Sequence, residues 1–89
     1  MITEERRNAL RMDVNCEIFC KTEDELYKAV CVTLSTSGIT FISEHAFDVG
    51  DIVEVSVVSM SCFFITIARC EARENGVFEI GAGILDLPN

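Results

Sequence analysis

Residues 62–85 read CFFITIARCEARENGVFEIGAGIL, and their pattern of apolar and polar residues indicates the fold class. Two apolar runs, 62–72 and 77–85, flank Glu74-Asn75-Gly76, and an Asn-Gly pair between two such runs is a strong signal for a β-hairpin. Alternate residues of a strand share one face, so one side of each run is expected to face a core. Gly81 and Gly83 permit a bend or a close approach of another group. We therefore predict two antiparallel strands here.

The same alternation extends upstream of this hairpin. Four more strands are predicted at residues 14–20, 27–34, 39–42 and 51–59. A charged turn at 21–25, a turn at 35–38 and a loop at 43–50 join them, and Ala46 and Phe47 of the loop are expected to point inward. Gly38 is expected to supply a backbone conformation that other residues resist. Six short strands without a helix predict an all-β fold, a small antiparallel barrel or sandwich.

Composition indicates one globular domain. The chain has 89 residues, 49% hydrophobic and 25% charged, which argues against disorder. No apolar run approaches the roughly 18 residues of a membrane span, and Glu4 and Glu5 stand where a signal peptide would be basic. We expect a cytoplasmic protein without membrane insertion.

Cysteine and histidine usage argues against a metal site, a cofactor and catalysis. The five cysteines show no CxxC spacing and the chain has one histidine, so we expect reduced cysteines that act as small apolar core residues. One histidine provides little acid–base capacity near neutral pH, and no nucleophile–base arrangement is evident. We predict a protein that is not an enzyme.

Charge is distributed unevenly along the chain. The formal net charge is −8, yet three of the seven basic residues are Arg6, Arg7 and Arg11, so residues 12–89 carry four basic and thirteen acidic side chains, or −9. Such a body repels DNA and RNA, whose binding depends on many phosphate contacts. A small phosphate-bearing ligand meets only the local arginine cluster, and arginine fits phosphate oxygens and stacks on bases.

Two short motifs carry a family resemblance. Over residues 5–87 the chain resembles the PilZ domain, a bacterial receptor for the dinucleotide cyclic di-GMP. The closing stretch, 77–87, looks like the last strand of that family. The RxxxR motif of the family is matched by Arg7 and Arg11, with Arg6 before them. The family's (D/N)xSxxG motif is matched by Thr33, Ser35 and Gly38, with threonine at the Asp/Asn position.

The resemblance implies a fold and a site. It implies a six-stranded antiparallel β-barrel over residues 13–87 and a flexible, arginine-bearing N-terminal arm over residues 1–12. Arg7 and Arg11 would grip phosphates and guanine edges, Arg6 would stack on a base, and the position of Thr33 would accept hydrogen bonds from guanine. A neutral hydroxyl replaces a charge-assisted contact there, so binding is expected to be about tenfold weaker or more.

The predicted function is a cyclic di-GMP-binding receptor or adaptor whose arm changes on binding and which signals to a separate, unidentified protein. The alternative is a ligand-independent PilZ-like protein-interaction domain, for example in type IV pilus assembly. Phe63, Ile65 and Ile67 are expected to line the barrel, which turns Phe64 outward. We favour a loop that covers Phe64; otherwise it marks a protein-binding surface, which leaves a homo-dimer open.

Overall fold

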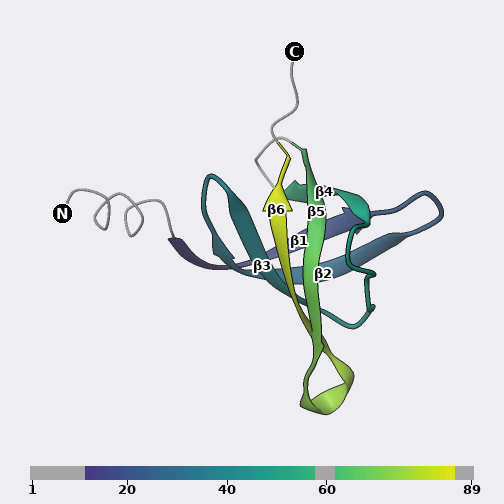
Figure 1. Ribbon diagram of the computed structural model, residues 1–89. Coiled ribbons are helices and arrows are strands. Elements are labelled where there is room, and N and C mark those ends of the chain that lie inside the picture. Colours follow the sequence, from purple (N-terminus) through teal and green to yellow (C-terminus); the bar gives the residue numbers. More distant parts are fainter. Residues whose placement is uncertain (1–11, 58–61, 86–89) are drawn as a thin grey trace.

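The computed structural model describes residues 12–57 and 62–85, which form six β-strands and one short 3-10 turn (Figure 1). Each predicted strand overlaps one of these, so the all-β prediction is confirmed. The elements are β1 (Met12–Lys21), β2 (Leu26–Leu34), β3 (Gly38–Ser43), β4 (Ile52–Val57), β5 (Phe63–Ala72), η1 (Glu74–Gly76) and β6 (Phe78–Ile84).

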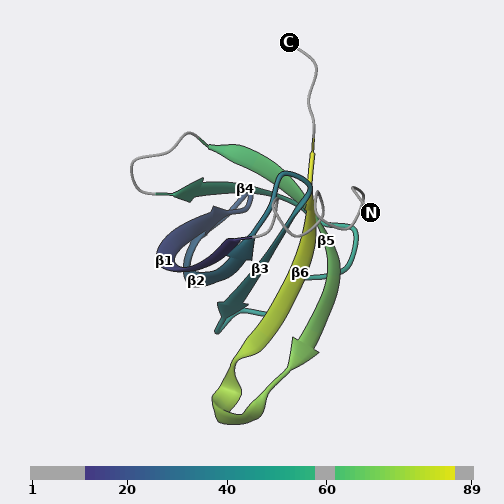
Figure 2. The same ribbon diagram turned by 90° about the vertical axis from the view of Figure 1, so that its left-hand side faces the viewer.

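The strands close into an antiparallel barrel in the order β1-β2-β3-β6-β5-β4 (Figures 1 and 2). Pairing of β1 with β4, from Ile18 opposite Val57 to Lys21 opposite Glu54, completes the ring. Closure removes the free edges that a flat sheet would expose. The predicted six-stranded barrel is thus confirmed, whereas the predicted arm, residues 1–12, lies outside the described residues except for Met12. No helix in the described ranges could cross a bilayer.

The inward face of every strand contributes to one core. Its largest fully buried side chains are Phe41, Ile18, Ile65, Ile67 and Ile80. Ile65 and Ile67 therefore lie inside as predicted, and Phe63 packs against the core while only partly buried. The cysteines divide: Cys20 and Cys31 belong to the core, Cys16 and Cys70 pack at its edge, and Cys62 is exposed.

The loop between β3 and β4 packs one aromatic ring into the core. Phe47 is 4% exposed, and its ring lies edge-on to Phe41 at 6.1 Å between centroids. His45 stacks on Tyr27 at 3.8 Å and meets Phe47 edge-on. The inward prediction is correct for Phe47 and wrong for Ala46, which is exposed, because the larger ring takes the interior position.

A β-bulge in β5 reverses the direction of its side chains. The register with β6 shifts between Ile67 and Arg69, which leaves Ala68 as the extra residue. Ile67 is buried before the bulge, and Cys70 packs against the core after it, so Arg69 faces outward. On the same strand Phe64 remains 37% exposed, and the expected covering loop is not found among the described residues.

Candidate functional site

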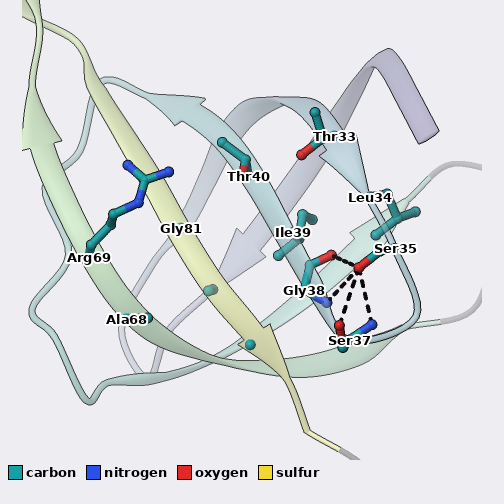
Figure 3. Close-up of a pocket in the computed structure, with 12 residues that line it drawn as sticks. Thr33, Leu34, Ser35, Ser37, Gly38, Ile39, Thr40, Ala68, Arg69 and Gly81 are labelled. Atoms are coloured by element: carbon teal, nitrogen blue, oxygen red, sulfur yellow. Dashed lines mark hydrogen bonds between the residues drawn. The ribbon is translucent and has the colours of Figure 1, made fainter. Parts of the chain in front are cut away.

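A pocket of about 420 Å³ lies on the outer face of the barrel, where the β2–β3 turn meets β6 and β5 (Figure 3). Seven of its twelve lining residues are serine, threonine or glycine. Thr33, Ser35 and Gly38, the three predicted site residues within the described ranges, all line it. The full lining is Thr33, Leu34, Ser35, Ser37, Gly38, Ile39, Thr40, Ala68, Arg69, Gly81, Ala82 and Gly83.

Ser35 organises the turn at one end of the pocket. Its hydroxyl oxygen accepts hydrogen bonds from the backbone N–H of Gly38 at 3.0 Å and of Ser37 at 3.2 Å (Figure 3). The same hydroxyl lies 3.3 Å from the carbonyl of Gly38, to which it donates. The Ser35 backbone N–H also donates to that carbonyl, at 2.9 Å. Ser35 therefore shapes the turn, which presents the hydroxyl groups of Thr33 and Ser37 to the pocket.

Glycines form the floor of the pocket on β3 and β6. The prediction that Gly38 needs an unusual backbone conformation is wrong, because positive φ occurs among the described glycines only at Gly50 and Gly76. The reason for glycine at position 38 is space: an added Cβ would lie 3.2 Å from the carbonyl oxygen of Ala82. Gly38 is the register partner of Gly83, so bare backbone lies side by side on two strands.

One row of residues crosses the pocket from β2 to β5. Thr33 pairs with Thr40, Thr40 with Gly81, and Gly81 with Arg69. Strands are spaced about 4.8 Å apart, so this row is roughly 14 Å long. Two threonine side chains thus lie at one end of the row, and the Arg69 side chain extends from the other end over Gly81.

The arginine at the end of this row belongs to a small ion-pair network. Arg69 lies 3.4 Å from Glu79 and 3.5 Å from Glu71. Arg73 contacts the same two carboxylates, through its Nε to Glu79 at 3.0 Å and its terminal nitrogen to Glu71 at 3.2 Å. The hydrogen bond from Arg73 is the main cause that lowers the pKa of Glu79, and the bond from Arg69 adds to it.

The predicted arginines lie outside the described residues, but the chain itself limits their distance from the pocket. β1 begins at Met12, which is the register partner of Leu34, a lining residue. Arg11 is the next residue along the chain, and an extended chain from Met12 reaches Arg7 within about 18 Å. The length of chain between these arginines and Met12 is therefore short enough for them to reach a ligand in the pocket.

Sequence reasoning named three of the twelve lining residues as site residues, and two that it missed, Thr40 and Arg69, carry polar side chains outside the β2–β3 turn. Arg69 could have been found by counting outward from the hairpin, because Arg73 pairs with Val77 by a backbone hydrogen bond and the register then runs to Arg69 opposite Gly81. The alternation of inward positions 63, 65 and 67 predicts instead that the side chain at position 69 points inward, because the pattern does not reveal the bulge.

The cysteines and acidic residues do not form a second chemical centre in the described part of the chain. Within it, no three His, Cys, Asp or Glu residues are grouped to hold a metal ion. Burial raises the pKa of the Cys20 thiol to about 12 and that of Cys31 to about 11. Such thiols stay protonated near neutral pH and are poor nucleophiles.

A closed barrel with an outer pocket of hydroxyls, glycines and one arginine has the geometry of a ligand-binding module. The model of the PilZ domain family matches residues 5–89, and the chain belongs to that family. PilZ domains are binding and adaptor domains, and in general they are receptors for cyclic di-GMP.

One solved structure illustrates the shared fold. It is the inhibitor of motility of Bacillus subtilis, MotI/DgrA, with a TM-score of 0.71 at 10% sequence identity. The alignment covers 89% of this chain and 42% of that one, so the chain spans less than half of its length. None of the curated proteins matches the sequence.

Proposed function

We propose that this protein is a non-catalytic, cytoplasmic receptor for cyclic di-GMP that passes its signal to a separate protein. The proposal is supported by the position of one motif in a pocket and by the place in the chain of the other. Thr33, Ser35 and Gly38 line a single pocket, and the strand that continues the RxxxR segment begins at a residue paired with Leu34 of that pocket.

The chemistry of the pocket suits a guanine dinucleotide. The glycines that line the pocket carry no side chain that would project against a flat base, and hydroxyl groups can both donate to and accept from the edge of the base. The acidic body disfavours a long polyanion, whereas Arg7 and Arg11 can neutralise the two phosphates of a cyclic dinucleotide.

The signal is a change of the arm. In the proposal, Arg6, Arg7 and Arg11 close over the ligand, and the surface that a downstream protein meets changes with them. Trypsin cleaves after these three arginines, so bound ligand is expected to slow cleavage there. Unchanged cleavage at saturating ligand would show that the arm takes no part.

Titration calorimetry with cyclic di-GMP tests the proposal. The double variant Arg7→Ala/Arg11→Ala is expected to lose most of the affinity, roughly 3–6 kcal/mol if each arginine makes one charge-assisted contact. A matched control is Lys21→Ala/Lys28→Ala, which removes the same number of positive charges from residues that do not line the pocket. The control should bind like the wild type, and equal binding by all three proteins would reject the mechanism.

The second candidate is a ligand-independent interaction domain. Thr33 in place of a carboxylate or amide favours it, as do exposed apolar side chains on neighbouring strands, with Ile52 of β4 62% exposed and Phe64 of β5 37% exposed. The same titration separates the two functions, because this candidate predicts no heat of binding for any of the three proteins.

A further inference from the structure

Arg69 is directed to the pocket by two separate features of the barrel. The first is the β-bulge at Ala68, which turns Arg69 from the core side to the outer face of β5. Without the bulge, a charged side chain would follow Ile65 and Ile67 into the interior, where burial of an unpaired charge is strongly unfavourable. The bulge therefore places the guanidinium on the face that carries the pocket.

The second feature is Gly81, which gives the side chain its path. A Cβ added at Gly81 would lie 3.0 Å from Nε, 3.2 Å from Cζ and 3.3 Å from Cγ of Arg69. The arginine therefore lies across the bare backbone of β6, and Figure 3 shows it extended over the strand at Gly81. Gly81 has no positive φ, so this close approach is what favours glycine there.

Arg69 can leave its present partners at little cost. Its side chain is 43% exposed, its partners Glu71 and Glu79 are 51% and 26% exposed, and exposed ion pairs contribute little to stability. Arg73 contacts both carboxylates as well, so neither is left unpaired when Arg69 moves. The hydrogen bond from Arg73 is also the main cause of the lowered pKa of Glu79.

We propose that Arg69 is a ligand-contacting residue of this pocket and that its guanidinium donates hydrogen bonds to a guanine base of the bound dinucleotide. This inference rests on the proposed function and deepens it. Among the described residues that line the pocket, Arg69 is the one with a charged side chain. An arginine recognises guanine by donating two hydrogen bonds, one to O6 and one to N7 of the base. A hydroxyl group across the pocket has only one hydrogen to donate and cannot make both bonds.

Two ligands and two matched variants test the assignment by calorimetry. The ligands are cyclic di-GMP and its 7-deaza analogue, which replaces the N7 acceptor by C–H. Arg69→Ala is expected to bind cyclic di-GMP roughly 5- to 150-fold more weakly. The wild type should prefer the natural ligand to the analogue several-fold, and Arg69→Ala should lose that preference. Arg73→Ala removes an arginine outside the pocket but leaves Glu71 and Glu79 to Arg69, so it should weaken binding less than Arg69→Ala and keep the preference for the natural ligand.

Gly81→Ala provides an independent route to the same result. Its methyl group would displace the Arg69 side chain while leaving the guanidinium in the protein, so affinity should fall in the same direction as in Arg69→Ala. Normal binding by Arg69→Ala overturns the inference and leaves the proposed function intact. Equal weakening for both ligands overturns the guanine contact. Absence of binding by the wild type overturns the proposed function and this inference with it.

Discussion

Single residues shape the pocket by what they lack as much as by what they carry. Gly81 and Gly38 leave out a Cβ where Arg69 and a carbonyl oxygen approach, respectively. Ser35 uses its hydroxyl to hold the turn, and Thr33, Ser37 and Thr40 are the other hydroxyl-bearing residues of the pocket. Thr33 stands where the family has Asp or Asn, so its replacement should change the affinity for cyclic di-GMP most directly.

Thr33→Asn is expected to tighten binding of cyclic di-GMP about fivefold. The amide offers both an acceptor and donors to a guanine edge, and one additional neutral hydrogen bond contributes about 1 kcal/mol. Calorimetry on the wild type and the variant measures the change. Thr33→Val is the matched control, since it keeps the shape and removes the hydroxyl, and it should weaken binding. If neither substitution changes the affinity, position 33 is not part of the ligand-binding site.

At the scale of elements, two irregular segments matter beyond the regular strands. The bulge in β5 sets the direction of Arg69, and the loop between β3 and β4 packs Phe47 into the core. Both are short departures from an alternating pattern. The barrel thus depends on regular strands for its core and on irregular ones for its site and for part of its packing.

Phe47→Ala is expected to lower the free energy of unfolding by about 3–5 kcal/mol. Phe47 is 4% exposed and contacts the rings of Tyr27, Phe41 and His45, so truncation leaves a cavity in the core. Urea denaturation followed by far-UV circular dichroism measures the loss. Ala46→Gly in the same loop is the control, because Ala46 is exposed and should change stability by less than about 1 kcal/mol. Similar losses for both variants would contradict the role of Phe47.

The sequence predicts the individual strands better than the pairing of those strands in the barrel, and the reasons are physical. Alternation and the Asn75-Gly76 signal are local, so all six strands and the hairpin were found. Local patterns carry no information on the pairing of β3 with β6 or of β1 with β4. The bulge at Ala68 was also hidden, since one extra residue changes the side-chain direction without changing composition. Thr33, Ser35 and Gly38 were predicted as site residues because they match a contiguous motif of the family, whereas Arg69 is far from that motif along the chain and was missed.

At the scale of the whole molecule, closure concentrates the few binding groups at one place. The barrel brings β2, β3, β6 and β5 side by side, so residues 33–40 meet residues 68–83 around a single pocket. Residues 12–89, which include the whole lining of this pocket, carry a formal net charge of −9. A small anion held by a few arginines suits such a molecule better than a long one.

Closure of the barrel also buries two thiols, and these make the free energy of unfolding depend on pH in the alkaline range. Burial, with a smaller contribution from a neighbouring cysteine, raises the pKa of Cys20 from 9.0 to about 12 and that of Cys31 from 9.0 to about 11. In the unfolded chain both thiols ionise near pH 9, so above that pH the folded state holds more protons. Their stabilising effect is complete below about pH 8 and declines as the pH rises towards 11 and 12.

The free energy of unfolding should therefore fall above pH 9 by up to about 1.4 kcal/mol per pH unit for each buried thiol. Urea denaturation between pH 7 and about 10.5, in the presence of a reductant, measures this slope. Cys20→Ala is expected to be less stable at neutral pH but to show a shallower decline, because one of the two protons is removed. Cys62→Ala, which removes the exposed thiol, should retain the wild-type slope. Equal slopes in the wild type and Cys20→Ala would mean that the Cys20 thiol does not hold its proton in the folded barrel.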